Sequence, residues 1–191
     1  MRAIAILVFA TFLNACATPG VAPREFLDEQ TAATITVVAE PVIFVGTSSL
    51  AARVDRPRSE FGATGNRDYL ELYGIDVNRM GSHQQYFVVQ KWLGDKGASV
   101  TAVLELQTGE GAVELRSTDE DLRKLGLSGP IAPEFSKSSQ WWYFPTDTAT
   151  LRRVAGASGL VANLTVGDQR TAYALFSDGR AQLGALASAL P

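Results

Sequence analysis

The chain has 191 residues, of which 46% are hydrophobic and 19% are charged, and its formal net charge is −3. This composition is typical of a globular protein with one substantial core and excludes an intrinsically disordered chain. The acidic balance and the lack of an evident basic face argue against nucleic acid as a partner, because phosphate binding needs clustered lysine and arginine.

The chain begins with the order of features found in a bacterial export signal. Met1 and Arg2 form a minimal positive region, and an uncharged apolar run follows at 3–13. As a helix, this run would span only about 16 Å, whereas the hydrocarbon core of a bilayer is about 30 Å thick. We therefore expect a cleavable signal peptide at 1–15 and not a transmembrane helix.

The apolar run ends in Leu13-Asn14-Ala15-Cys16, and Cys16 is the only cysteine of the chain. This ending resembles the lipobox of bacterial lipoproteins, although Asn14 replaces the commoner alanine or serine. The resemblance implies cleavage before Cys16, lipidation of its thiol and acylation, for example with palmitate, of its new amine. Several acyl chains would anchor the protein stably in a membrane. The alternative is an ordinary secretory signal that is cleaved at Ala15 or Ala17.

The resemblance also bears on location and domain organisation. Ala17 replaces the aspartate that retains enterobacterial lipoproteins at the inner membrane, so we expect an outer-membrane anchor with the domain facing the periplasm. The inner membrane and the cell surface are the alternatives. Residues 16–30 are expected to form the lipidated tether, because 17–24 is rich in proline, glycine and small residues. Residues 31–191 are expected to form a single β-rich globular domain without internal disulfides.

The pattern from residue 33 to residue 116 is mostly that of β-strands. β-Branched runs, alternating apolar residues and one run that is apolar on both faces indicate the strands. Gly109-Glu110-Gly111 between the last two predicts a β-hairpin. The polar segment 53–67, with four arginines, predicts a loop. The expected strands are 34–39, 42–45, 68–78, 83–93, 101–107 and 112–116.

The strand expected at 68–78 has an interrupted pattern. Leu70 and Leu72 share one face, and Ile75 and Val77 continue that face only if one residue is inserted. We therefore predict a β-bulge at Gly74.

The rest of the chain combines helices and strands. Thr118 and Gly126 are the expected cap residues of a short helix at 117–125. A hairpin is expected around Gly167-Asp168, and helices at 147–157 and 178–190 are expected to bury Leu151, Val154, Leu183 and Leu186. The fold class that follows is α+β and β-rich, with an antiparallel β-sandwich and two or three peripheral helices.

The segment QWWYF at 140–144 is the one unusual cluster. It predicts a strand with bulky rings on both faces, because neighbouring side chains of a strand point to opposite sides. If one tryptophan faces the core, Trp142 is expected to point the other way, towards a helix, a partner or solvent. Core packing of both rings is the simpler interpretation, and Trp141 and Trp142 are the candidate partner-binding residues.

The residues that usually carry catalysis are scarce. His83 is the only histidine, and its neighbour Ser82 would point to the opposite face of a strand, so we interpret His83 as a surface residue at a strand start. Too few histidines and cysteines are present for a zinc site, and no phosphate-binding glycine loop occurs, so we expect no metal and no cofactor. Asp68 with Glu71 or Asp76 is the one carboxylate arrangement considered for glycoside hydrolysis.

The body of the chain is similar to proteobacterial outer-membrane lipoproteins of comparable size, a resemblance that implies no particular activity. The residues that carry it lie at 68–70 and 77–79, at Trp92 and at Leu125-Gly126-Leu127. We therefore expect a non-catalytic envelope module that binds a protein or an envelope polymer. The alternatives are a carboxylate-based hydrolase of peptidoglycan or glycan, and an inhibitor or accessory of an envelope machine with a protruding loop at 53–67.

Overall fold

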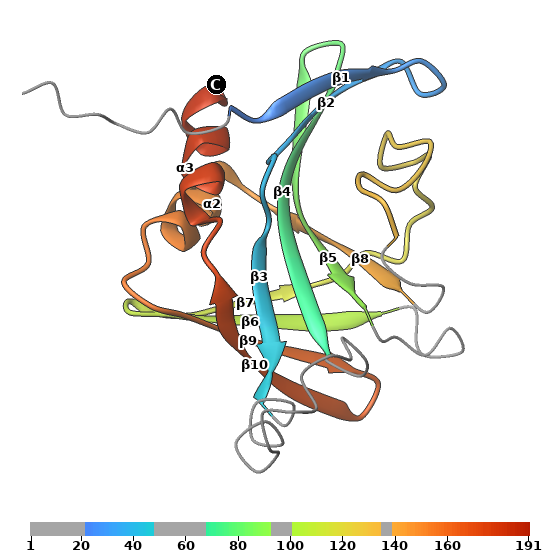
Figure 1. The fold of residues 1–191 in the computed structure, drawn as a ribbon. Helices are drawn as coiled ribbons and strands as arrows, with labels where there is room; N and C mark the ends of the chain where they lie inside the picture. The colour runs from blue at the N-terminus through green and yellow to red at the C-terminus, as the bar shows by residue number, and fades with distance from the viewer. Residues whose placement is uncertain (1–21, 48–67, 93–100, 135–138) are drawn as a thin grey trace, which may run out of the picture.

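The structure is a computed structural model that describes residues 22–47, 68–92, 101–134 and 139–191 (Figure 1). The signal peptide, Cys16 and the loop expected at 53–67 lie outside the described residues. The described strands are β1 (Arg24–Asp28), β2 (Ala33–Val37), β3 (Val42–Gly46), β4 (Tyr69–Arg79), β5 (Ser82–Lys91), β6 (Ala102–Thr108), β7 (Gly111–Arg116), β8 (Gln140–Thr146), β9 (Leu160–Val166) and β10 (Gln169–Ser177). The described helices are α2 (Thr148–Ala155) and α3 (Arg180–Ala189).

The ten described strands form one antiparallel sheet, which confirms the predicted β-rich α+β class. The order β8-β5-β4-β3-β10-β9-β6-β7 runs across it, and β2 and β3 pair with different halves of the same edge of β4. In Figure 1, β3, β4 and β5 run lengthwise, β8 runs obliquely to them, and β6, β7 and β9 run across them, so the curved sheet forms two layers like a sandwich. The chain after β7 then reaches β8, where the Thr118 amide donates to the Tyr143 carbonyl at 2.8 Å.

The sheet begins earlier than its expected first strand. Strand β1 pairs with β2 in register from Arg24 opposite Val37 to Asp28 opposite Ala33. It occupies part of the range assigned to the tether. Both Phe26 and Leu27 of this strand are exposed, so its pattern lacks the buried face that marks a strand in a sequence.

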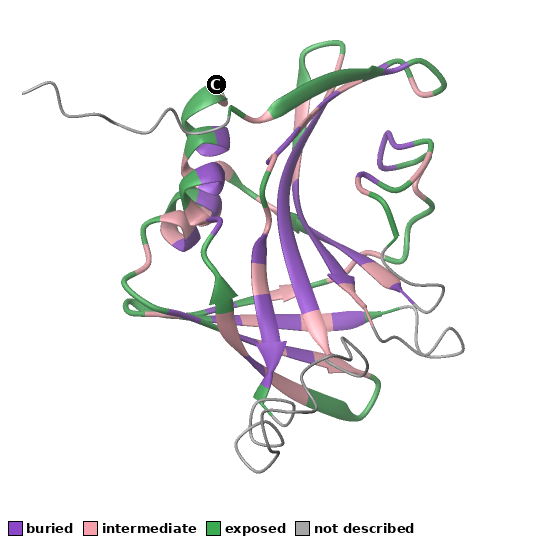
Figure 2. Ribbon diagram, in the orientation of Figure 1, coloured by how far each residue is buried: buried purple, intermediate pink, exposed green. Residues whose placement is uncertain are grey.

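The predicted bulge at Gly74 is wrong. Strand β4 pairs with β5 in unbroken register through Gly74 opposite Phe87. The apolar residues change from one face to the other along β4 because both of its faces are buried, as Figure 2 shows along most of the strand. Leu70 and Leu72 point to the inner face, the side enclosed by the sheet and the helices, while Ile75 and Val77 point to the opposite, outer face.

Helix packing explains why glycine stands at position 74. A side chain at this inner-face position would begin 2.7 Å from Leu183 Cδ2 and 3.0 Å from Leu186 Cδ2, both in α3. The helices thus pack directly on the backbone of β4. The real interruption lies on the neighbouring edge, between the end of β2 and the start of β3, where the Val38 amide still donates to the Gly74 carbonyl at 3.1 Å.

The hairpins and both C-terminal helices are confirmed. Hairpin β6–β7 turns between Thr108 and Gly111, and hairpin β9–β10 turns at Gly167-Asp168. The side chain of Asp147 caps α2 by accepting from the Thr150 amide at 2.6 Å. Leu151, Val154, Leu183 and Leu186 are fully buried. Within the described ranges, no helix has the length and apolar character needed to cross a bilayer.

The helix predicted at 117–125 is wrong, because the structure has only a turn there. The Gly126 amide donates to the Arg123 carbonyl at 3.2 Å and the Leu127 amide to the Leu122 carbonyl at 2.9 Å, with Gly126 at a φ of 86°. This is a Schellman motif that ends a helix, here after a single turn. The capping signals were present, but the chain leaves the sheet at Thr118 and has no room for further turns before Leu125 and Leu127 pack.

Candidate functional site

The segment 117–134 lies on the outer face of β4, β5 and β8, and we call it the outer segment. Two of its own residues, Leu125 and Leu127, are buried. Its backbone is fixed to the N-terminal hairpin, since the Ser128 amide donates to Asp28 Oδ2 at 2.6 Å and the Thr31 hydroxyl to the Gly126 carbonyl at 2.8 Å. These contacts hold the outer segment close to the sheet, and a hollow is left where it meets β8.

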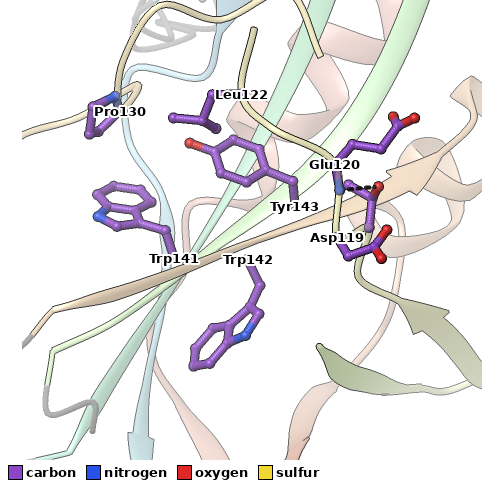
Figure 3. A pocket seen from close by; sticks show the side chains of 8 residues that line it. Asp119, Glu120, Leu122, Pro130, Trp141, Trp142 and Tyr143 are labelled. Carbon is purple, nitrogen blue, oxygen red and sulfur yellow. Dashed lines mark hydrogen bonds between the residues drawn. The ribbon is translucent and has the colours of Figure 1, made fainter. Parts of the chain in front are cut away.

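This hollow is a pocket of about 240 Å³, which we call the β8 pocket (Figure 3). Its wall combines β8 with the outer segment, so the residues that form it are separated in the sequence. The indole of Trp141 and the ring of Tyr143 lie beside Leu122 and Pro130, as Figure 3 shows. The lining residues are Thr118, Asp119, Glu120, Leu122, Pro130, Trp141, Trp142 and Tyr143.

The hydroxyl of Tyr143 is the most informative atom of the β8 pocket. Tyr143 is only 7% exposed, yet its hydroxyl has no hydrogen-bond partner within the described part of the chain. Figure 3 shows the hydroxyl directed into the space between Trp141 and Leu122. Burial raises the pKa of the phenol, so the group is neutral and able both to donate and to accept. A buried polar atom without a partner costs about 1–3 kcal/mol, and it calls for an explanation.

Two further polar atoms on the same face share this property. Trp141 Nε1 and Gln90 Oε1 are buried without a hydrogen-bond partner among the described residues. Gln90 lies opposite Trp141 in the β5–β8 pairing, so the two side chains are neighbours on the outer face. An unsatisfied donor and an unsatisfied acceptor therefore lie on the same face of the sheet as the orphan hydroxyl of Tyr143.

The rim of the β8 pocket is acidic. Asp119 and Glu120 are exposed, and neither takes part in an ion pair with any described residue. The Glu120 amide donates to the Thr118 hydroxyl at 3.1 Å, which fixes the backbone of the rim. The site thus joins an aromatic wall to free negative charge.

The two candidate partner-binding tryptophans point to opposite faces, as the strand pattern predicts, and Trp142 packs in the core, as the simpler interpretation expects. Trp142 is 3% exposed and lies opposite Val89, a buried inner-face residue, so it belongs to the core. Trp141 is the ring on the outer face, where its centroid is 6.2 Å from that of Tyr73. The sequence alone could not assign the faces, because both sides of β8 are apolar.

The three carboxylates considered for glycoside hydrolysis do not converge. Asp68 and Asp76 lie on the inner face at opposite ends of β4, about 26 Å apart along the strand at 3.3 Å per residue. Asp68 accepts from the Tyr173 hydroxyl at 2.8 Å and lies 3.5 Å from Lys91 Nζ. Glu71 points to the outer face and accepts from the Tyr73 hydroxyl at 2.6 Å.

His83 is more than a surface residue at a strand start. Its Nδ1 is 2.8 Å from Oδ2 of Asp76, which is almost fully buried and also accepts from Gln85 Nε2 at 2.8 Å. The carboxylate therefore orients the imidazole. A general base has this arrangement, but no described hydroxyl is bonded to Nε2 of His83, and a serine nucleophile would need that contact.

Among the residues that the structure describes, no group of three or more histidine, cysteine, aspartate or glutamate side chains is arranged to hold a metal ion. Sequence analysis identified Trp141 but missed Leu122, Pro130 and Tyr143, which form a site only because the outer segment folds back onto β8.

Comparison of the chain with protein-family models, curated proteins and solved structures finds no significant match.

Proposed function

We propose that the chain is a lipid-anchored lipoprotein of the bacterial envelope that binds a protein partner through the β8 pocket and catalyses no reaction itself. The anchor is Cys16, and the expected location is the outer membrane with the domain facing the periplasm. The order of positive region, apolar run and cysteine in the first sixteen residues supports this half of the proposal.

One observation carries the binding half of the proposal: the orphan hydroxyl of Tyr143 inside the β8 pocket. A folded protein usually satisfies its buried polar groups, so an unsatisfied one calls for an explanation, and a ligand group that completes the hydrogen bond is the one we propose. Trp141 beside it offers a large rigid surface of the kind that dominates binding hot spots.

The size of the β8 pocket favours a protein partner over a free small molecule. Its volume of about 240 Å³ is below the roughly 300–1,000 Å³ that encloses a small-molecule ligand. A cavity of this size suits a single side chain that projects from a larger surface. An envelope polymer is the competing occupant, and the experiment below tells the two apart.

A photoreactive amino acid at Pro130 tests the proposal in the cells that produce the protein. Pro130 is an exposed wall of the β8 pocket, so a substitution there keeps the core intact. We expect a discrete protein adduct after irradiation. The matched control is Val161, which is 43% exposed and does not line the pocket. Equal yields at the two positions, or adducts with glycan alone, would contradict the proposal.

A second candidate is a hydrolase, favoured by the pair of Asp76 and His83. Here His83 Nε2 would activate water for attack on an envelope substrate. The purified full chain would then turn over peptidoglycan or a model glycan, and His83→Gln would abolish turnover. Binding through the β8 pocket predicts instead that His83→Gln leaves partner capture unchanged.

A further inference from the structure

Strand β8 lies at one end of the sheet, so only one of its two edges is paired. Its partner is β5, and no other described strand pairs with it. In an antiparallel pair, the backbone groups of successive residues point alternately towards the partner strand and away from it. The unpaired side of β8, which we call the open edge, therefore presents the N–H and C=O groups of every second residue.

A hydrogen bond and a proline show which residues face the open edge. The Thr118 amide donates to the Tyr143 carbonyl at 2.8 Å, so the backbone groups of Tyr143 point away from β5. By alternation, those of Trp141 and Pro145 point the same way. Proline has no N–H to donate, and within sheets it is found at unpaired edges and bulges. Its presence at position 145 agrees with this assignment.

The open edge carries backbone groups that the fold does not use. No described residue bonds to the N–H or the C=O of Trp141, or to the N–H of Tyr143. The Tyr143 carbonyl is already taken by Thr118. A row of unpaired donors and acceptors on a strand edge is a template for pairing with another extended chain.

The β8 pocket lies along this open edge. Trp141 and Tyr143 line it from one face of β8 and Trp142 from the other, and Figure 3 shows their rings on these opposite sides. A hollow lined from both faces passes around an edge of the strand, and β5 occupies the other edge. Thr118, which bonds to the open edge, is a further lining residue. The described residues therefore leave space beside the unpaired backbone.

We propose that the open edge of β8 binds an extended segment of the partner protein by β-strand addition. The backbone of this segment accepts from the Trp141 and Tyr143 amides and donates to the Trp141 carbonyl. Thr118 blocks the Tyr143 carbonyl, so the added segment is short. In this mode of recognition, backbone bonds supply affinity and pockets for alternate side chains supply specificity.

Strand addition also accounts for the orphan hydroxyl in the β8 pocket. The side chains of an added strand that stand directly opposite Trp141 and Tyr143 point to the same face as these two rings. One of them enters the pocket and completes the hydrogen bond of the Tyr143 hydroxyl. This inference rests on the proposed function, because it names how the same site recognises its partner.

The first arm of the test examines the open edge without a partner. NMR measures how fast the backbone amide protons of the full chain, purified in mild detergent, exchange with water. The Trp142 amide points to β5 and is held in the ladder, whereas the Trp141 amide is unpaired. We expect the Trp141 amide to exchange at least about 100-fold faster, because only the Trp142 amide needs an opening of the sheet. Equal rates would overturn the inference.

The second arm compares Trp141→Pro with Trp141→Val, each with the photoreactive amino acid at Pro130. Both substitutions remove the indole, but only proline also removes the N–H. That N–H points away from β5, so the ladder between the two strands is kept. We expect the adduct yield of Trp141→Pro to be about twofold to tenfold below that of Trp141→Val, the range of one backbone hydrogen bond. Equal yields would contradict strand addition.

Glu114→Pro is the matched control on another unpaired edge. The Ser117 amide donates to the Ala102 carbonyl at 2.9 Å, so by alternation the Glu114 N–H points away from β6. Strand β7 does not line the β8 pocket, and Glu114→Pro should keep the wild-type yield. An equal loss in Glu114→Pro and Trp141→Pro would also overturn the inference. Circular dichroism establishes that the variants fold, and the amide-exchange arm decides if Trp141→Pro does not.

The result is separable from that of the proposed function. If the wild-type Pro130 photoadduct contains a protein partner and the proline and valine variants give equal yields, the proposed function stands and strand addition fails. If the wild type forms no protein adduct in cells, the proposed function fails, and strand addition fails with it.

Discussion

The two faces of β8 share one backbone, but only the outer face carries buried polar atoms that lack a hydrogen-bond partner among the described residues. On the inner face, Trp142 and Phe144 are almost wholly buried among apolar neighbours. On the outer face, Trp141 and Tyr143 each carry a buried polar atom without a partner among the described residues. The inner residues contribute their burial to folding, whereas the outer residues have unused hydrogen-bonding capacity, which the proposed function assigns to binding. In that proposal, alternation along a single strand separates stability from recognition.

The largest expected effect concerns the inner face. Phe144→Ala removes a fully buried ring and should lower the free energy of unfolding by about 3–5 kcal/mol. Urea unfolding monitored by circular dichroism measures the change. Phe176→Ala is the control, since Phe176 is 53% exposed and its loss should cost under about 1 kcal/mol. Similar costs for the two variants would refute the assignment of Phe144 to the core.

The next effect tests the close approach of α3 to β4. Gly74→Val places a branched side chain where Leu183 Cδ2 lies only 2.7 Å from the Cβ position. Overpacking of this kind should cost about 2–3 kcal/mol in the same unfolding experiment. Gly159→Val, at a position with no atom within 4 Å of a new Cβ, should be nearly neutral. A stable Gly74→Val protein would mean that the helices do not pack on β4.

Two buried tyrosines provide a smaller and sharper contrast. Tyr173→Phe removes a hydroxyl that donates to Asp68 at 2.8 Å, so it should cost about 1–2 kcal/mol. Tyr143→Phe removes a hydroxyl without a described partner, so the free energy of unfolding should stay within about 0.5 kcal/mol or rise. A loss of more than about 1 kcal/mol in Tyr143→Phe would show that the hydroxyl is satisfied within the fold.

The pH dependence of stability tests the burial of Glu71 on the outer face of β4. Burial raises the pKa of Glu71 above its ordinary value of 4.5, against the opposing hydrogen bonds from Tyr73 and Trp92. The native state therefore holds this proton more tightly than the unfolded state does. The stabilisation is complete below pH 4.5 and is lost as the pH rises through the folded pKa.

Glu71→Gln removes this titration and keeps an acceptor oxygen for the Tyr73 hydroxyl. The stability of the variant should therefore decline less than that of the wild type as the pH rises above 4.5. Urea unfolding across a series of pH values measures the two slopes. Parallel curves would contradict the account of Glu71.

Sequence patterns predicted the fold correctly where the residues fitted one kind of secondary structure and no other. The glycines at 109, 111 and 167 specified hairpins, and the helical spacing of Leu183 and Leu186 specified a buried helix face. The patterns failed at β4 and β8, which are buried on both faces. In such strands, the alternation of apolar residues does not reveal which face of the sheet a given side chain points to. The outer segment contributes to this burial, since Gly126 lies against Val77 on the outer face of β4.

The candidate site was predictable only in part. Trp141 stands out in the sequence as a bulky ring on a strand, but nothing in the sequence distinguishes Tyr143 from the other aromatic residues of the same run. Its importance depends on an absent hydrogen bond, and no sequence pattern reports that. Asp119 and Glu120 lie inside the segment 117–125, for which the sequence predicts a helix, so their position at the rim of the β8 pocket is evident only from the structure, where that segment forms a turn.

The most direct test of the central claim is the yield of the Pro130 photoadduct in cells that produce the Tyr143→Phe chain, compared with the wild type. A typical hydrogen bond contributes about 0.5–1.5 kcal/mol, so loss of the hydroxyl should weaken binding about twofold to tenfold. We predict that the yield of the protein adduct falls steeply while the fold retains its stability. An undiminished yield from the Tyr143→Phe chain would contradict the claim that the orphan hydroxyl belongs to a binding site.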